Sequence, residues 1–504
     1  MKLKQIALAA AVLAGAPAAF ALTPAQVDGN TVRLWLSGAS APTASVYKGV
    51  LTLCRGVQYK DALGATHLNP GTSDVHLYLE SSSSGRLPGA AGDRMAYTCT
   101  VDTADDRAGT LEGKKVVVFH TVEGGSFNYV TPHISIAGEV NPNLPGKLSR
   151  TSNIEGLSAG CASGAAENVT VDISGLTNTV GVYRGCATTT QNFSAGQALR
   201  ASVTAAPDRP EGGFSDTEYL MNKLNLDVTT ELGAIGSEVS TNIGQVFGAA
   251  VSHPLYAQLQ KNQALVNTVA LDGEACDGVY TAGACQPNLP ASTYTKIANV
   301  NTIAGVRGSL FGVSAFPGTS AKLQFHRRAI TSGTQSASNL RFLNKPCATG
   351  EPQGAMEPSR VANSTARVAV TENSSTGGVK TGLTNASTAG EFGLGWVSME
   401  NIPVAGTDKW AFVKLDGVAP NADAMQRQTA MDGNYSAFYE LVAFTAATAF
   451  SEGQDLIKAV NTSLGNPGIT NLAGLFITPV AGVTGTNVGK VSRTAGNSCS
   501  PAVQ

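Results

Sequence analysis

The segment 328–334 combines the residue types of an anion-binding site. Arg328 offers a planar fork of N–H donors, which suits two oxygens of one anion. Ser332, Gly333 and Thr334 open a predicted helix, where hydroxyls, backbone N–H groups and the positive end of the helix dipole attract negative charge. This pattern predicts a site for a tetrahedral oxyanion. The alternative is that Arg328 pairs with a surface carboxylate and the other three residues only cap the helix.

The elements that must position these groups are a strand and a helix. Alternating apolar residues predict the strand before the segment, and apolar residues at helical spacing predict the helix after it. Two further loops of small residues, at 37–42 and 80–85, follow strands predicted at 31–36 and 75–79. Strands that alternate with helices predict α/β lobes with partly parallel sheets, in which ligands lie beyond the carboxyl ends of strands.

The N-terminus has the pattern of a secretory signal peptide. Lys2 and Lys4 precede an apolar run at 6–13, and Ala19-Phe20-Ala21 supplies small residues for cleavage after Ala21. We therefore expect a periplasmic or secreted protein that begins near residue 22. No later stretch approaches the roughly 20 apolar residues that a membrane span needs.

The charge balance excludes a strong global field. The chain has 34 Lys and Arg residues against 36 Asp and Glu residues, so the net charge is −2. Nothing in this balance favours nucleic acid or an anionic membrane as a partner, and any preference for anions must be local. The six histidines show no metal-binding spacing, and we expect neither a metal nor another cofactor.

Eight cysteines follow the signal region, and an even number in an exported chain predicts disulfides. Short loops close most easily, so we expect sequential pairing, although the sequence alone leaves the connectivity open. The alternative of a metal site lacks any C-x-x-C spacing. The expected pairs are Cys54–Cys99, Cys161–Cys186, Cys276–Cys285 and Cys347–Cys499.

At 504 residues the chain is too long for one core, and two domains or lobes are expected. Residues 86–210 have short strand patterns and many turn residues, which predicts a β-rich, disulfide-bearing insertion. Residues 348–389 are rich in Gly, Ser and Thr and predict a long surface excursion. Residues 441–449 predict a buried strand or helix, and residues 455–464 predict an amphipathic helix.

An ordered set of motifs resembles the phosphate-binding components of ABC transporters, which have the type II periplasmic binding-protein fold. The similar motifs are Gly38-Ala39-Ser40-Ala41-Pro42 before Val46-Tyr47, Ser83-Ser84-Gly85-Arg86, Ser215-Asp216, Arg328 with Ser332-Gly333-Thr334, and the strand at 393–397. Residues 86–210 and 348–389 lie outside the resemblance.

The resemblance implies two lobes that close over a ligand without covalent chemistry. Lobe one would comprise residues 22–245, including the insertion, and residues 405–504, with lobe two at 246–404. An ABC permease would be the partner. The implied ligands of phosphate are Ser40, Ala41 through its N–H group, Ser84, Asp216, Arg328, Ser332, Gly333 and Thr334.

Some positions depart from the family. Ile330 stands where the family has an aspartate beside the arginine, Ala41 replaces a phenylalanine, and Arg86 replaces a glycine. These changes widen the expected ligand from inorganic phosphate to a related oxyanion or a phosphorylated compound.

Asp216 is expected to discriminate between anions. A carboxylate repels an anion unless a proton lies between them, and hydrogen phosphate carries such a proton whereas sulfate does not. The alternative for Ser215-Asp216 is a turn that caps a helix at 218–224.

Two other functions fit parts of the sequence. Ser45-x-x-Lys48, residues 215–217 and residues 380–382 imitate the motifs of penicillin-binding enzymes, in which a serine attacks an acyl carbon. A secreted or surface interaction protein could reuse the binding-protein fold, with residues 86–210 as its contact surface.

Overall fold

A computed structural model describes residues 22–81, 93–103, 105–142, 144–151, 161–265, 276, 278–280, 283–347, 367–493 and 497–504. The expected signal peptide at 1–21 and the Ser83-Ser84-Gly85-Arg86 motif lie outside the described residues. Within the described chain, helices and strands alternate around one mixed sheet, which makes the protein a mixed α/β protein.

The large sheet has 14 strands among the described residues, in the order β15-β14-β16-β12-β19-β11-β1-β6-β5-β4-β9-β8, with β17 and β20 also paired to β12. The strands are β1 (Val32–Gly38), β4 (His76–Leu79), β5 (Arg94–Thr100), β6 (Lys115–Thr121), β8 (Glu167–Ile173), β9 (Leu176–Arg184), β11 (Gly212–Ser215), β12 (Gly236–Ser252), β14 (Leu323–Arg328), β15 (Val368–Asn373), β16 (Gly393–Ser398), β17 (Trp410–Phe412), β19 (Phe438–Ala446) and β20 (Leu475–Ile477).

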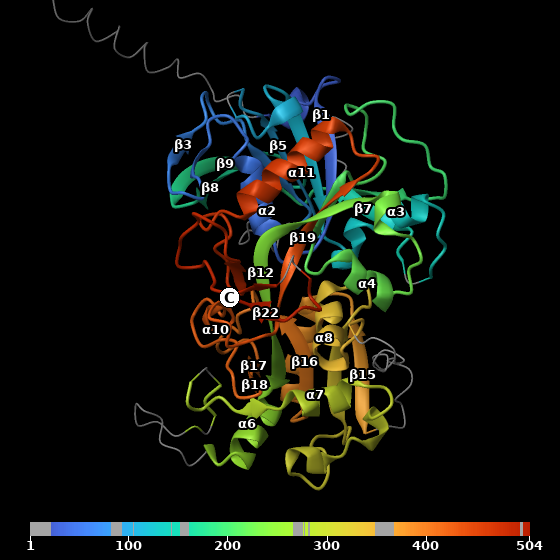
Figure 1. Ribbon diagram of the computed structural model, residues 1–504, viewed down its shortest axis with the longest axis vertical. Helices are drawn as coiled ribbons and strands as arrows, with labels where there is room; N and C mark the ends of the chain where they lie inside the picture. Colours follow the sequence, from blue (N-terminus) through green and yellow to red (C-terminus); the bar gives the residue numbers. More distant parts are fainter. Residues whose placement is uncertain are drawn as a thin grey trace, which may run out of the picture.

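Helices cover this sheet (Figure 1). They are α2 (Thr43–Leu51), α3 (Thr131–Ile136), α4 (Tyr219–Asn225), α5 (Leu232–Ile235), α6 (His253–Asn262), α7 (Ala291–Ala298), α8 (Gly333–Leu343), α9 (Thr376–Thr388), α10 (Gln428–Met431) and α11 (Ser451–Leu464). Smaller two-stranded sheets pair β2 (Gln58–Lys60) with β3 (Thr66–Leu68), β7 (Lys147–Thr151) with β10 (Thr188–Asn192), β13 (Asn288–Leu289) with β18 (Lys414–Leu415), and β21 (Ser492–Arg493) with β22 (Ala502–Val503). No helix of the described chain combines the length and apolar character that a membrane crossing requires.

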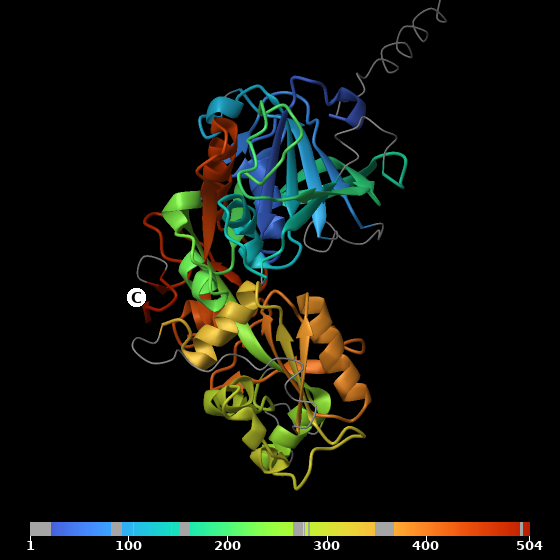
Figure 2. The same ribbon diagram turned by 90° about the vertical axis from the view of Figure 1, so that its right-hand side faces the viewer.

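Strand β12 links two hydrophobic clusters. It pairs with β19 from Gly236 to Val246, with a register shift between Ser240 and Gly244, and with β16 from Phe247 to Val251. Figures 1 and 2 show this strand running from the upper to the lower part of the molecule. The upper cluster lies where α2 and α11 pack together against β1, and the lower one surrounds β12, β14 and β16.

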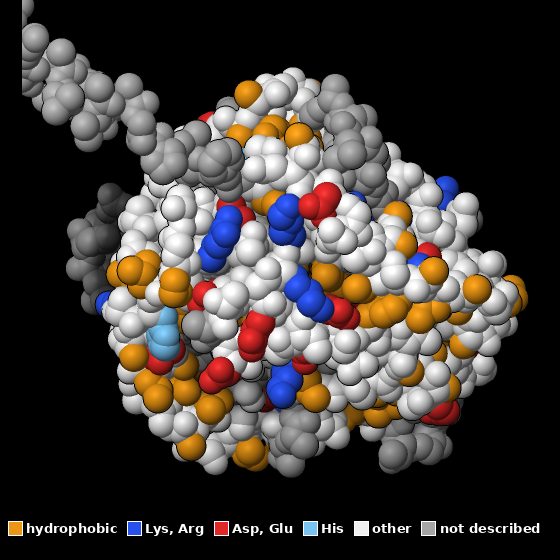
Figure 3. Space-filling model, turned by 90° about the horizontal axis from the view of Figure 1, so that it is seen from above, with side chains coloured by type: hydrophobic (Ala, Val, Ile, Leu, Met, Phe, Trp, Pro, Cys, Tyr) orange, Lys and Arg blue, Asp and Glu red, His pale blue; other side chains and the backbone are white. Residues whose placement is uncertain are grey.

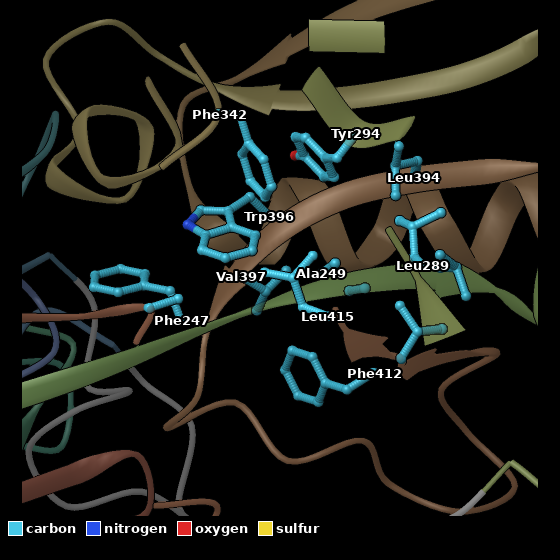
Figure 4. Packing of buried hydrophobic residues seen from close by; sticks show 14 of the residues in the cluster. Phe247, Ala249, Leu289, Tyr294, Phe342, Leu394, Trp396, Val397, Phe412 and Leu415 are labelled. Carbon is cyan, nitrogen blue, oxygen red and sulfur yellow. The ribbon is translucent and has the colours of Figure 1, made fainter. Parts of the chain in front are cut away.

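The lower cluster is rich in aromatic side chains. Trp396 of β16 lies edge-on to Phe342, and Tyr294 stacks on Phe342 with ring centroids 3.9 Å apart (Figure 4). Aromatic pairs in offset or edge-to-face arrangements add to the free energy of apolar burial. This packing holds α7 and α8 on the sheet, and thereby fixes where α8 begins.

The two regions outside the resemblance both contribute strands to the large sheet. Residues 86–210 are β-rich and carry the Cys161–Cys186 bridge, and their strands β5 and β6 pair within the large sheet, with β6 parallel to β1. The prediction of a surface excursion at 348–389 is wrong from residue 367 onward. There, β15 extends the sheet and α9 packs on β16. Small residues in these stretches serve close packing: a Cβ at Gly382 would lie 2.3 Å from the His326 ring.

The surface mixes charges of both signs. On the face seen from above Figure 1, basic and acidic side chains are interspersed (Figure 3), so neither sign dominates that face.

Four disulfides join sequential cysteines: Cys54–Cys99, Cys161–Cys186, Cys276–Cys285 and Cys347–Cys499. Disulfides of this number are typical of proteins in oxidising, extracytoplasmic compartments. The last of them connects the end of α8 to the C-terminal segment.

Removing the Cys347–Cys499 bridge is expected to destabilise the protein more than removing Cys276–Cys285. The first closes a loop over a separation of 152 residues and the second over 9. Lost chain entropy then gives upper estimates of about 5 and about 3 kcal/mol for the two bridges. Two double variants, one with both Cys347 and Cys499 replaced by serine and one with both Cys276 and Cys285 replaced, can be compared by urea unfolding, which measures the loss of stability in each. Equal losses would contradict the entropic account.

Candidate functional site

A cavity of about 610 Å³ opens between segments that are distant in the sequence. Its walls come from the ends of strands and the starts of helices, as expected for ligand sites in α/β sheets. The lining residues are Ser40, Ala41, Thr43, Ala44, Asp93, Met95, Val122, Gly124, Gly125, Ser126, Asp216, Arg328, Ser332, Thr334, Ser374, Ser375, Thr376, Gly377, Lys380, Ser398, Glu400, Asn401, Leu472 and Ala473.

Arg328 is the last residue of β14, and two hydrogen bonds fix the position of its guanidinium. Its Nη1 donates to Thr376 Oγ1 (2.7 Å) and its Nη2 donates to the carbonyl of Ser374 (3.1 Å). The residue is 7% exposed, and its Nε has no hydrogen-bond partner in the described chain. Among the described residues no carboxylate oxygen lies within 4.0 Å of its nitrogens. The alternative of a surface ion pair is therefore wrong.

Burial destabilises the charged form of Arg328. It lowers the pKa of the guanidinium to about 10, against the opposing pull of Asp216, Glu400 and Asp93. The group still carries its proton at neutral pH. A buried cation without an adjacent counter-ion is rare in proteins, because its lost hydration must be replaced by a partner.

The start of α8 supplies the second set of donors. Ser332 is the N-cap in an extended conformation, and its hydroxyl makes no cap bond. The hydroxyls of Ser332 and Thr334 make no hydrogen bond within the described chain, and both residues line the cavity. Gly333 lies between them in the first turn. The unpaired N–H groups of a first helical turn attract anions.

Two more helices begin at the same cavity. Ser375 is the N-cap of α9, and its hydroxyl accepts from Gly378 N (3.1 Å). Thr376 and Gly377 in the first turn of α9 line the cavity, as do Ser40 and Ala41 just before α2. Three helix N-termini therefore face one space, and their dipoles favour negative charge there.

Asp216 lies opposite the start of α8. Its Oδ2 accepts from Ser126 Oγ (2.6 Å), and its Oδ1 has no partner in the described chain although the residue is only 5% exposed. Burial raises the pKa of this carboxyl to about 6, with Glu400 adding to the rise and Ser126 and Arg328 opposing it. The side chain does not cap α4, whose N-cap is Glu218.

Gly333 permits the close approach of α8 to Asp216. A Cβ at this position would lie 2.8 Å from both Asp216 Cβ and Ser126 Oγ. The walls also touch beside it, where Thr331 Oγ1 donates to the carbonyl of Gly124 (2.5 Å) and Phe127 N donates to the carbonyl of Thr331 (3.1 Å). The cavity is therefore bounded by direct contact on this side.

The structure brings most of the predicted site residues together. Ser40, Ala41, Asp216, Arg328, Ser332 and Thr334 line the cavity, and Gly333 contacts Asp216. Ser84 lies outside the described residues.

The sequence prediction missed Ser126, the start of α9, Lys380 and Glu400. Gly124-Gly125-Ser126 follows β6, and Ser375-Thr376-Gly377 follows β15. A loop of small residues after a strand was the available signal in both cases. Lys380 and Glu400 carry no comparable local signal.

The motifs shared with penicillin-binding enzymes are not assembled in this cavity. Ser45 is fully buried in α2 and does not line it, whereas Lys380 does. The Ser215 hydroxyl donates to the carbonyl of Thr217 (2.7 Å). Within the described chain, no group of three or more His, Cys, Asp or Glu side chains is arranged to hold a metal ion.

Comparisons with known proteins give little support for assigning this chain to a family. No protein-family model and no curated protein matches the chain. A protein from Clostridium perfringens, described as a phosphate ABC transporter substrate-binding protein with bound phosphate, is 12% identical over 49% of this chain and 79% of that chain, with a TM-score of 0.27. A possible phosphate-binding protein from Planctomyces limnophilus is 12% identical over 50% of this chain and 70% of that chain, with a TM-score of 0.25. A phosphate-binding protein from Stenotrophomonas maltophilia is 16% identical over 49% of this chain and 67% of that chain, with a TM-score of 0.22. TM-scores this low carry no argument about this chain.

Proposed function

We propose that this chain is a solute-binding protein that captures phosphate or a related tetrahedral oxyanion in the cavity, without covalent chemistry. The proposal includes a two-lobed type II arrangement, with residues 22–245 in one lobe and residues 246–404 in the other. The chain after residue 404 still packs Trp410, Phe412 and Leu415 into the lower cluster, so it would return to the first lobe later than the expected residue 405. Strand β12 supports the two-lobed arrangement, because it runs continuously from one hydrophobic cluster to the other. Export to the periplasm or medium and an ABC permease as partner belong to the same proposal.

The observation that carries the proposal is the buried guanidinium of Arg328, which has no adjacent carboxylate among the described residues and lies beside the start of α8. An anion seated there would accept from the N–H groups of Nη1 and Nη2 that Thr376 and Ser374 leave unused, from the hydroxyls of Ser332 and Thr334, and from the first N–H groups of α8. Charge-assisted hydrogen bonds contribute about 1.5–3 kcal/mol each, so several together can offset the loss of water from the anion. The anion would also supply the counter-charge that the described residues do not place next to Arg328.

Asp216 gives the site a preference for a protonated anion. Hydrogen phosphate can donate its proton to the Asp216 carboxylate, whereas sulfate leaves two negative groups facing each other. Because burial raises the pKa of Asp216 to about 6, the carboxyl is ionised at neutral pH and discriminates there.

Sulfate affinity should therefore increase as the pH falls. If sulfate binds only when Asp216 is protonated, its association constant rises about tenfold per pH unit between about pH 8 and 6 and levels off below. Calorimetric titration at several pH values measures this dependence. The Asp216→Asn variant is the control, because it should bind sulfate with little pH dependence. A flat profile in the unmodified protein would contradict the role of Asp216.

The direct test of function is titration calorimetry of the exported protein with phosphate, sulfate and phosphate esters. We expect saturable binding of at least one phosphate species at one site per chain. If no such anion binds, the oxyanion proposal is overturned, and the alternative of an interaction protein takes its place.

A further inference from the structure

We infer that the preferred ligand is a phosphate monoester whose organic group carries hydroxyls, and this inference rests on the proposed function. Its phosphoryl group would occupy the seat at Arg328 and the start of α8. Its hydroxylated group would contact a second part of the cavity lining, formed by Lys380, Ser398, Glu400 and Asn401.

The size of the cavity supports a ligand larger than an inorganic anion. Its volume of about 610 Å³ falls in the range of about 300–1,000 Å³ that is typical of pockets for organic ligands. The walls already touch through Thr331 and Gly124, so the space is not simply the gap of two separated walls. A single phosphoryl group would fill only part of this volume.

This second part of the lining carries unused donors. Lys380 lines the cavity from α9, and its ammonium makes no ion pair or hydrogen bond among the described residues. An ammonium group has three N–H donors. All three are available to oxygen atoms of a ligand.

The same part of the lining carries an acceptor. Glu400 Oε1 accepts from Ser398 Oγ (2.7 Å) and Asn401 Nδ2 (3.0 Å), and Oε2 accepts from Gln245 Nε2 (3.3 Å). A carboxylate has about four acceptor positions, so Oε2 keeps one for a ligand. Glu400 lines the cavity and is partly exposed there.

Hydroxyl groups fit this combination best. A hydroxyl can donate to Glu400 and accept from Lys380 at once, whereas a second anionic group would face Glu400 and Asp93, and an ammonium group would face Lys380. Met95, Val122 and Leu472 add apolar surface on which a carbon skeleton can pack. With inorganic phosphate bound, all of these groups would contact only water.

The test compares inorganic phosphate, ethyl phosphate, glycerol phosphate and a hexose 6-phosphate by calorimetry on the exported protein. We expect the two hydroxylated esters to bind at least about tenfold more tightly than inorganic phosphate and ethyl phosphate, as one or two added hydrogen bonds allow. Ethyl phosphate is the matched control, because it has the ester linkage without hydroxyls.

Two variants locate the contact. Lys380→Met and the nearly isosteric Glu400→Gln should each reduce the preference for hydroxylated esters over inorganic phosphate by about tenfold. Circular dichroism and thermal unfolding show whether each variant is folded. Inorganic phosphate binding as tightly as the hydroxylated esters would overturn this inference and leave the proposed function standing. Failure of every phosphate species to bind would overturn the proposed function as well.

Discussion

Replacing Arg328 by methionine should abolish measurable phosphate binding while leaving the ligand-free protein folded. The variant loses the central cation of the site and at least two charge-assisted hydrogen bonds at about 1.5–3 kcal/mol each. This corresponds to a loss of affinity of about a hundredfold to ten-thousandfold. Thermal unfolding of the ligand-free variant should be unchanged or raised, because methionine does not have to bury a charge. Calorimetry and thermal unfolding together measure both effects.

Arg327 provides a matched control for this experiment. It is the neighbouring residue of β14, its Nη2 pairs with Glu372 Oε2 (2.6 Å), and it does not line the cavity. Arg327→Met should therefore change phosphate affinity little. If both arginine variants weaken binding equally, the effect comes from the summed electrostatic field of the protein, and Arg328 has no special role.

Replacing Asp216 by asparagine should stabilise the ligand-free protein at alkaline pH. Burial raises the pKa of this carboxyl from 3.8 to about 6, so the folded state binds the proton more tightly than the unfolded state does. The resulting stability is fully present below pH 3.8 and is lost as the pH rises through about 6. Asparagine does not titrate and avoids this loss, which amounts to about 3 kcal/mol for a shift of about two pH units.

Urea unfolding at about pH 8 and about pH 4 tests the Asp216 prediction, since linkage confines the difference to the higher pH. The Asn variant should be more stable at the higher pH and equal to the unmodified protein at the lower one. It should also lose the discrimination between phosphate and sulfate. A variant that is less stable at both pH values would show that Asp216 holds the fold and does not serve the ligand.

Arg328 and Asp216 illustrate how much of the site could be predicted from the sequence. Arg328 and the start of α8 lie within seven positions of each other, so strand, turn and helix bring them together locally. Ser40 and Asp216 belong to other loops, but those loops follow β1 and β11, which pair in parallel and end on the same side. The family resemblance indicated Asp216, and the parallel pairing of β1 with β11 explains why it lies at the same cavity as Ser40.

The remainder of the site depends on packing that no short motif encodes. Lys380 reaches the cavity because α9 packs on β16, and the small residues of that stretch had favoured a surface excursion. Glu400 follows β16 and reaches the site because β16 pairs with the second half of β12. The register of β12, which changes partner from β19 to β16 along one strand, is set by long-range pairing. Local periodicity carries no information about such a change of partner.

The most direct test of the central claim is a crystal structure of the protein grown with arsenate. Arsenate is tetrahedral and carries a proton like hydrogen phosphate, and its arsenic atom can be located by anomalous scattering. We expect one strong peak within hydrogen-bond distance of the Arg328 guanidinium and the first turn of α8, with an arsenate oxygen next to Asp216 Oδ1. An empty cavity at saturating arsenate, or a peak away from Arg328, would contradict the account.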